Sequence, residues 1–272
     1  MYIISTVVDK EKVKVALFDK EYNLSVKKDG KLADLAELCA SVITEAGIKT
    51  DDVAYAGIAF DTSLENPCSL ASDLEKAIGV KCLCVSLIDA QALGEAYKLD
   101  DSDTLVMLRI DNTVDCGIII DKKVYEEAHN QSKNIAHTVI NFGGFECACG
   151  RKGCFEAYAS NSGLDRIAAE AGVEGKATHA KLFATDTQEA KNAQKTYVKY
   201  LAAGITNIIN LFQPRYLVLD GDFTKVGDAL MNPLMDIVLR EQYTHSMPNK
   251  GNIRFADTET DTALLGAALL GR

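Results

Sequence analysis

Four residues between positions 137 and 156 are of the types that bind zinc. His137 is followed by Cys147, Cys149 and Cys154. A structural zinc ion takes four sulfur or nitrogen ligands at the corners of a tetrahedron, and one histidine with three cysteines provides such a set. The residue types and their spacing therefore predict a structural zinc site with these four ligands.

Glycines in the same segment stand where a tight turn is required. Between Cys149 and Cys154, Gly150 and Gly153 flank Arg151 and Lys152, and glycine adopts positive φ angles without steric cost. We expect a helix after Cys154, whose N-terminus would favour the thiolate. The alternatives are three reduced core cysteines without a metal and a disulfide, which a cytosolic location disfavours. The segment is rich in glycine and poor in large apolar residues, which favours the metal site.

The complete pattern is Cys-x-Cys-Gly-x-x-Gly-Cys-x-Glu with a histidine ten residues before it. It resembles the zinc motif of the ROK family (repressors, open reading frames, kinases), which includes bacterial glucokinases, N-acetylmannosamine kinases and sugar-responsive repressors. The resemblance extends weakly along nearly the whole chain. It implies an α/β chain with a two-lobed actin-like ATPase fold, which is a duplicated ribonuclease-H-like fold with mixed sheets, a zinc-binding insertion and a cleft between the lobes.

The resemblance also implies a catalytic residue. The family has Asn-Asp followed six residues later by Gly-Glu, and here Ile88-Asp89 precedes Gly94-Glu95. Asp89 then stands where a general base would remove the proton of the attacking sugar hydroxyl. The alternative is that Asp89 is only the N-cap of a helix. Ile88 replaces an asparagine that would bind the sugar.

Three further residues match sugar-binding positions of the family. Glu156 follows the third cysteine as the family's sugar-contacting glutamate does, although a glutamate there also suits the first turn of a helix. Asn134 stands where the family has a glutamate. His137 can bind zinc through one ring nitrogen and a sugar hydroxyl through the other. The remaining histidines, His129, His179 and His245, are interpreted as surface or local-structure residues.

The phosphate-binding turns depart from the family pattern. The first hairpin usually carries Asp-x-Gly-Gly-Thr, and here Val7, Asp9, Lys10 and Glu11 occupy the defining positions. The second usually reads Gly-Thr-Gly-x-Gly, and here residues 111–115 read Asp-Asn-Thr-Val-Asp. A phosphate site needs small residues and exposed backbone N–H groups. Neither hairpin retains them.

Several of the replacements are acidic. The adenosine-side turn, usually three glycines, reads Asp-Gly-Asp at residues 220–222. A carboxylate close to a triphosphate repels it by ~1–4 kcal/mol per pair, depending on the effective dielectric constant. Lys10, Lys12 or a bridging Mg²⁺ could offset part of this repulsion, and acidic residues are also common in ordinary turns. These substitutions argue against normal binding of ATP and Mg²⁺.

The pattern of apolar residues predicts the same series of elements twice. The first series has strands at residues 2–8, 12–18, 21–27, 53–60 and 81–86, and helices at 32–46, 70–78 and 89–97. The second has strands at residues 104–110, 116–120, 123–125, 216–219 and 252–256, and helices at 187–212, 226–243 and 260–270. We therefore expect a small N-terminal lobe of residues 1–108 plus 256–272, onto which the final helix packs, and a large zinc-containing lobe of residues 109–255.

The net charge and composition limit the kinds of partner that we expect for this protein. The net charge is −10, with 47% hydrophobic and 25% charged residues, so neither a nucleic-acid surface nor a membrane span is expected. The charged start of the chain does not resemble a signal peptide, and the first strand begins at Tyr2 without a preceding DNA-binding segment. We expect a cytoplasmic protein.

Two functions remain open at this stage. The first is a kinase-like protein with a degraded ATP site that binds a hexose, an N-acylhexosamine or a phosphorylated sugar as a sensor or pseudokinase. The second is an active ATP-dependent hexose or N-acetylmannosamine kinase with Asp89 as general base. Family relatives form dimers, and the apolar face predicted for residues 187–212 exceeds the needs of one lobe, so we also expect a homodimer.

Overall fold

The computed structural model describes residues 1–61, 64, 66–99, 102–125, 134–241 and 252–272. The chain forms two compact units. The first contains Met1–Asp103, Gly117–Tyr125 and Asp257–Arg272, and the second contains Thr104–Cys116 and Glu126–Ala256. Among the described residues, no helix is both long enough and apolar enough to cross a membrane.

The first sheet is mixed and has the order β3-β2-β1-β4-β5. Its strands are β1 (Tyr2–Asp9), β2 (Lys12–Asp19), β3 (Leu24–Lys31), β4 (Val53–Phe60) and β5 (Cys82–Ser86). The β1 strand pairs antiparallel with β2 and parallel with β4. The third strand begins at Leu24, three residues later than predicted. The Asp19 carboxylate accepts the backbone N–H groups of Glu21 and Asn23 and holds these residues in a turn.

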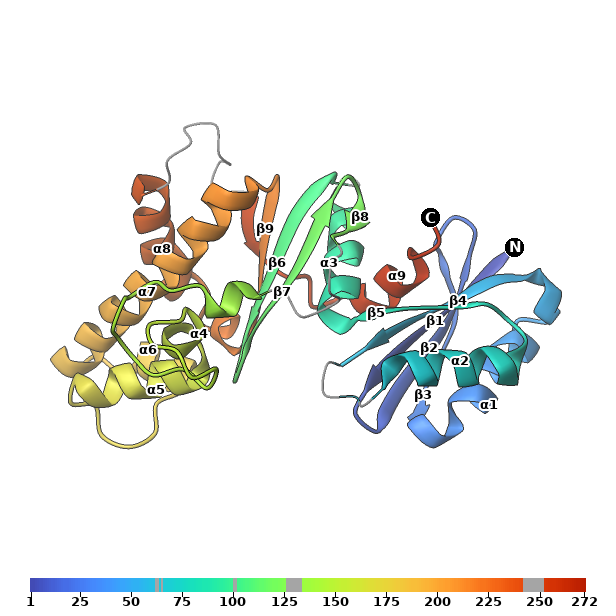
Figure 1. Cartoon of the computed structure of the whole chain (residues 1–272), viewed down its shortest axis with the longest axis horizontal. Helices are drawn as coiled ribbons and strands as arrows, with labels where there is room; N and C mark the ends of the chain where they lie inside the picture. The colour runs from blue at the N-terminus through green and yellow to red at the C-terminus, as the bar shows by residue number, and fades with distance from the viewer. Residues whose placement is uncertain (62–63, 65, 100–101, 126–133, 242–251) are drawn as a thin grey trace. The chain divides into compact units, whose positions relative to one another are not determined.

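Helices cover both faces of this sheet (Figure 1). On one face α1 (Leu35–Glu45) and α2 (Pro67–Ile78) enclose an apolar core with alternate residues of β1 and β2. On the other, α3 (Leu87–Lys98) packs against α9 (Thr262–Ala268), and the Ser5 hydroxyl of β1 donates to the Leu264 carbonyl. The prediction that the final helix packs on the first sheet is therefore confirmed.

The second sheet repeats the first. Its order is β10-β9-β6-β7-β8, with β6 (Thr104–Ile110), β7 (Val114–Ile120), β8 (Lys123–Val124), β9 (Tyr216–Gly221) and β10 (Ile253–Phe255). Read from the other edge, each strand corresponds to the strand five places earlier in the chain. Strand β6 pairs parallel with β9, as β1 does with β4. The predicted duplication is confirmed by this common order.

The second unit carries most of its helices between β8 and β10. They are α4 (Glu156–Ala159), α5 (Asn161–Glu170), α6 (His179–Ala184), α7 (Gln188–Phe212) and α8 (Asp228–Glu241). Short 3-10 turns complete the two units: η1 (Leu32–Asp34), η2 (Thr50–Asp52), η3 (Asn134–His137) and η4 (Asp222–Val226). Helix α8 begins two residues later than predicted because Gly227, with φ of 66°, ends the preceding η4 turn.

The longest helix, α7, uses its apolar face within its own unit. Tyr197, Leu201, Ile205 and Ile209 are all fully buried, and α7 packs against α4, α5, α6 and α8. The idea that this face exceeds the needs of one lobe is therefore wrong. Leu211, which is 69% exposed, is the large apolar residue that α7 leaves at the surface.

Candidate metal centre and ligand pocket

The four predicted zinc ligands lie together in the second unit. We call residues 137–156 the metal segment. The possible ligand atoms of His137, Cys147, Cys149 and Cys154 all lie within 4.8 Å of one another. The Cys149 and Cys154 sulfurs are 3.6 Å apart, and the Cys147 sulfur is 3.6 Å from Nδ1 of His137.

These distances fit a zinc ion. Ligands bound to zinc at ordinary lengths are separated by about 3.8 Å for two sulfurs and about 3.6 Å for a sulfur and a nitrogen. A disulfide would require a separation of about 2.05 Å, so Cys149 and Cys154 are two thiols. The donor set is also chemically suited to zinc, since it contains three sulfurs and one imidazole. The predicted residues are thus brought together, and Nδ1 is the histidine nitrogen that faces the cysteines.

Two glycines shape the segment as predicted. Gly150 has φ of 85° and Gly153 has φ of 82°. A Cβ atom on Gly153 would lie 2.0 Å from the Asn141 carbonyl oxygen, so no other residue fits there. The N–H of Gly153 donates to the Phe145 carbonyl, which folds the chain back beside Cys154.

The thiols differ in acidity. The pKa of Cys149 is lowered to about 6, first by a hydrogen bond from the Arg151 backbone. Burial raises the pKa of Cys154 to about 12. The expected stabilisation of the Cys154 thiolate by a helix is wrong, because α4 begins two residues later and has only four residues. A bound metal would itself displace the Cys154 proton.

An aromatic stack anchors the metal segment to the helices. The Tyr158 ring stacks on Phe145 with centroids 4.4 Å apart and lies 4.1 Å from the Tyr200 ring. Its hydroxyl accepts hydrogen bonds from the Phe145 N–H and the Asn141 amide. Tyr158 is fully buried, so the turn that precedes Cys147 has a rigid support.

Glu156 lies between the metal centre and the β6–β7 hairpin. One carboxylate oxygen accepts the Val114 N–H at 3.1 Å, and the other is 4.0 Å from the Cys147 sulfur. Glu156 and His137 therefore both approach the Cys147 sulfur. The side chain of Asn134, the third predicted sugar contact, lies outside the described residues.

The acidic side chains of the second hairpin, whose turn is residues 111–113, interact with other groups of the same unit. The Asp111 carboxylate accepts the Asp222 N–H at 2.9 Å, which joins this hairpin to the turn after β9. The Asp115 carboxylate lies 3.3 Å from the Arg109 guanidinium. Both acidic side chains thus have internal partners in places where the family pattern has glycine.

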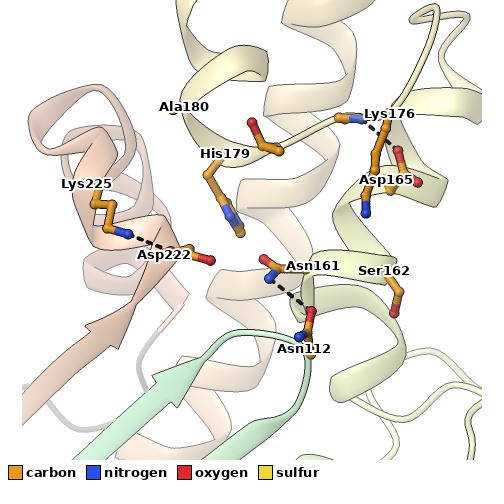
Figure 2. Close-up of a pocket in the computed structure, with 11 residues that line it drawn as sticks. Asn112, Asn161, Ser162, Asp165, Lys176, His179, Ala180, Asp222 and Lys225 are labelled. Carbon is orange, nitrogen blue, oxygen red and sulfur yellow. Dashed lines mark hydrogen bonds and ion pairs between the residues drawn. The ribbon is translucent and has the colours of Figure 1, made fainter.

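A cavity of about 470 Å³ lies beside this turn, entirely within the second unit (Figure 2). It is lined by Asn112, Asn161, Ser162, Asp165, Lys176, Ala177, Thr178, His179, Ala180, Asp222 and Lys225. Lys225 forms a 2.7 Å ion pair with Asp222, and this contact lowers the pKa of Asp222. None of the four predicted metal ligands lines the cavity, so it is a second candidate site.

His179 was missed as a pocket residue because no motif surrounds it in the sequence. It is 2% exposed, so of the two predicted roles, surface or local structure, the surface role is wrong and the local-structure role agrees with its contact to Tyr197. Its Nε2 lies 2.8 Å from the Tyr197 hydroxyl, which donates to the Ala159 carbonyl. The hydroxyl must therefore accept from Nε2–H, and burial lowers the pKa of His179 to about 4. His129 and His245 lie outside the described residues.

Comparison with known proteins decides the family. The sequence profile of the ROK family matches residues 26–272. The chain belongs to the ROK family. The predicted family is therefore confirmed.

Individual relatives include both enzymes and regulators. A glucokinase of Halalkalibacterium halodurans is 31% identical over 162 residues, which are 53% of this chain and 49% of the glucokinase. A xylose repressor of Bacillus subtilis is 26% identical over 180 residues, which are 64% of this chain and 46% of the repressor. The chain thus spans about half the length of these curated relatives.

A solved structure supports the fold. The ROK hexokinase from Thermus thermophilus aligns with a TM-score of 0.81 and 22% identity, covering 99% of this chain and 98% of that one. At this identity the likeness concerns the fold. The chain has the two-lobed actin-like ATPase fold of ROK kinases, so the predicted fold is confirmed, and the zinc-binding insertion stays a prediction.

Asp89, the predicted general base, lies in the first turn of α3 in the first unit. The N-cap of α3 is Ser86, not Asp89. The Ser86 hydroxyl donates to the Asp89 carboxylate at 2.6 Å and accepts the Asp89 N–H at 3.3 Å. This arrangement resembles a capping box, with the acidic residue at the third helical position. The carboxylate therefore has a structural role whether or not it also acts on a substrate.

The first hairpin is a tight two-residue turn. Asp9 pairs with Lys12, and Lys10 adopts φ of 56° between them. A non-glycine residue in this conformation is uncommon, and the family pattern has glycine at this position. Asp9, Lys10 and Glu11 are exposed, so three charged side chains stand at the surface where the family pattern has Gly-Gly-Thr.

Proposed function

We propose that this ROK protein binds a hexose, an N-acylhexosamine or a phosphorylated sugar as a sensor or pseudokinase. Support comes from Glu156 and His137, which approach the same cysteine of the metal centre. A carboxylate and an imidazole can hydrogen-bond several hydroxyls of a neutral ring. Asn134 would be a third contact.

The single observation that carries the loss of ordinary ATP turnover is the Asp111–Asp222 hydrogen bond. A phosphate at this turn would meet a carboxylate that already accepts the backbone N–H at 2.9 Å. Asp115 adds a second negative charge on the same hairpin. Since phosphoryl transfer depends on holding phosphates through positive or N–H groups, this turn opposes the reaction.

The second candidate is an active ATP-dependent hexose or N-acetylmannosamine kinase. Asp89 favours it, because Ser86 holds this carboxylate in one orientation and a general base must be fixed in position. The cavity beside Asp222 would then hold the nucleotide. Lys225 and Lys176, which line that cavity, could offset part of the acidic charge.

A binding screen separates the two candidates. Thermal shift is measured with glucose, mannose, N-acetylmannosamine and their 6-phosphates, and with ATP or ADP, each with and without Mg²⁺. The sensor predicts stabilisation by a sugar and none by nucleotide with Mg²⁺. Stabilisation by nucleotide with Mg²⁺, together with phosphorylation at an ordinary kinase rate, would contradict it.

Mutation of Asp89 needs a control for its capping role. Asp89→Asn removes the base and weakens the cap, whereas Ser86→Ala weakens the cap and the orientation of Asp89 but keeps the carboxylate, at a cost of about 1 kcal/mol. In an active kinase, Asp89→Asn would abolish turnover and Ser86→Ala would lower it without abolishing it. In the proposed sensor, both variants change thermal stability by similar amounts and neither changes a phosphorylation rate.

We propose zinc as the resident metal, held by His137, Cys147, Cys149 and Cys154. Its role would be structural, because the protein supplies all four ligands and leaves no open position for a reacting water. Binding would stabilise the metal segment and so fix Glu156 next to it. Metal analysis of protein purified without chelator should find about one zinc per chain.

We also propose a two-fold homodimer that uses the metal segment. Phe142 is 97% exposed and Val139 is 43% exposed, so this segment presents apolar side chains to solvent. An isologous contact would bury both from each copy. Light scattering at micromolar concentration should give a dimer mass, and Phe142→Ser should shift it toward the monomer. A monomer mass for the unmodified protein would contradict the proposal.

A further inference from the structure

The side chain of Arg151 reaches back to His137, the first residue of the metal segment. It lies in the turn between Cys149 and Cys154, and its guanidinium Nη2 donates to the His137 carbonyl oxygen at 2.7 Å. The backbone carbonyl of Arg151 accepts the Cys147 N–H at 2.9 Å. Arg151 is therefore hydrogen-bonded to the main chain of two predicted ligands that lie ten residues apart in the sequence.

The negative charge of the proposed metal centre would favour a cation such as the Arg151 guanidinium beside it. A zinc ion with three thiolates and one neutral imidazole has a formal charge of −1. Glu156 adds a carboxylate 4.0 Å from the Cys147 sulfur. A nearby cation would lower the cost of keeping the thiolates ionised.

Lys152, the next residue, is less suited to offset the charge of the thiolates. Lys152 forms an ion pair with Glu146 at 3.4 Å, so its charge is already opposed. Arg151 carries the same charge and instead contacts the centre.

We propose that Arg151 is a positioning residue of the metal centre. Its guanidinium holds the main chain of His137 in place and offsets the negative charge of the thiolates. This role rests on the proposed zinc site and is independent of which sugar the protein binds. It also depends on the shape of arginine, because a planar fork can contact a carbonyl and a sulfur together, whereas lysine offers a single point charge.

Zinc transfer to a chromogenic chelator tests the proposal. The zinc-loaded wild type is compared with Arg151→Ala, Arg151→Lys and the matched control Lys152→Ala. Loss of a group that supports metal ligands typically costs 10–100-fold. Since Arg151 is exposed, we expect release from Arg151→Ala to be about tenfold faster. Release from Arg151→Lys should be intermediate, and Lys152→Ala should match the wild type.

A spectroscopic measurement separates an electrostatic role from general loosening. In the cobalt-substituted protein, removing a cation next to the thiolates raises the energy of the sulfur electrons. The sulfur-to-cobalt absorption band should therefore move to longer wavelength in Arg151→Ala and stay in place in Lys152→Ala. Equal release rates and equal bands for Arg151→Ala and Lys152→Ala would overturn the proposal. A wild type that purifies without zinc and binds none would overturn it together with the metal site.

Discussion

The metal segment and the turn of the second hairpin lie in the same unit and contain the polar groups expected of a functional site, but they use them differently. In the metal segment, four donor atoms converge within 4.8 Å. In the second hairpin, Asp111 of the turn and Asp115 of β7 are instead bound by the Asp222 N–H and by Arg109. The donor atoms of the metal segment surround a point where an ion can bind. The carboxylates of the hairpin already have partners within the protein.

This difference gives the zinc motif and the phosphate-binding hairpin different dependences on an added ligand. A set of thiols at van der Waals distance gains little from its own members, so its stability depends on an added ion. A buried or half-buried carboxylate with internal hydrogen bonds needs no added group. We therefore expect zinc to stabilise this protein strongly and nucleotide to stabilise it little.

The largest effect should come from losing a metal ligand. Cys154→Ser should reduce zinc from about one per chain to near zero, because structural zinc sites contribute on the order of 10 kcal/mol of binding energy. Hydrogen exchange should then accelerate throughout residues 137–156. Cys84→Ser, which changes an exposed cysteine of β5, is the control. Unchanged exchange in the metal segment of the zinc-free variant would contradict the comparison.

Restoring the hairpins should have the next largest effect. The variant combines Asp9→Gly, Lys10→Gly, Glu11→Thr, Asp111→Gly and Asp115→Gly. Each close carboxylate removed should relieve ~1–4 kcal/mol of repulsion toward a triphosphate, so ATP affinity should rise at least tenfold before any turnover appears. Calorimetric titration of ATP with Mg²⁺ measures this change.

A second variant tests the effect of carboxylate charge without introducing glycines. Asp111→Asn with Asp115→Asn removes both charges while an amide oxygen can still accept the Asp222 N–H. Its ATP affinity should also rise. If neither variant binds ATP more tightly than the wild type, the carboxylates are not what excludes the nucleotide.

The cavity next to the hairpin should make stability depend on pH. Burial holds the pKa of His179 at about 4, below the usual 6.5, so the unfolded chain binds the extra proton first. The contribution of His179 is complete above pH 6.5 and is lost as the pH falls toward 4, by about 3 kcal/mol in total. Urea unfolding at pH 7.5, 5.5 and 4.5 measures it. His179→Gln should flatten this dependence, and an equal slope in both proteins would contradict the assignment.

The smallest effect should come from Glu156, which joins the two regions. Glu156→Gln keeps an oxygen for the Val114 N–H but loses the charge, and charge-assisted hydrogen bonds exceed neutral ones by about 1 kcal/mol. Exchange at Val114 should become several-fold faster with zinc content unchanged. The same variant should weaken sugar binding. A sugar affinity equal to that of the wild type would remove Glu156 from the ligand site.

The elements that could be predicted from the sequence are those governed by local patterns. The strands β1, β2 and β4 follow from short apolar runs, and α7 follows from its 3.6-residue periodicity. The cluster of the four proposed metal ligands was predictable because they lie within eighteen residues of one another and the segment contains glycines that permit tight turns. The boundary of β3 and the cap of α3 were predicted incorrectly, because side-chain hydrogen bonds from Asp19 and Ser86 decide them.

The sequence by itself therefore determined the family, the repeated order of strands and the metal donor set. Only the tertiary structure decided that Asp111 meets the Asp222 N–H, 111 residues away, and that Glu156 meets Val114, 42 residues away. It also placed His179 in a cavity wall. Ligand spacing within one turn is limited by backbone geometry, whereas contacts between distant turns depend on how the sheet brings strand ends together. No local pattern encodes those distances.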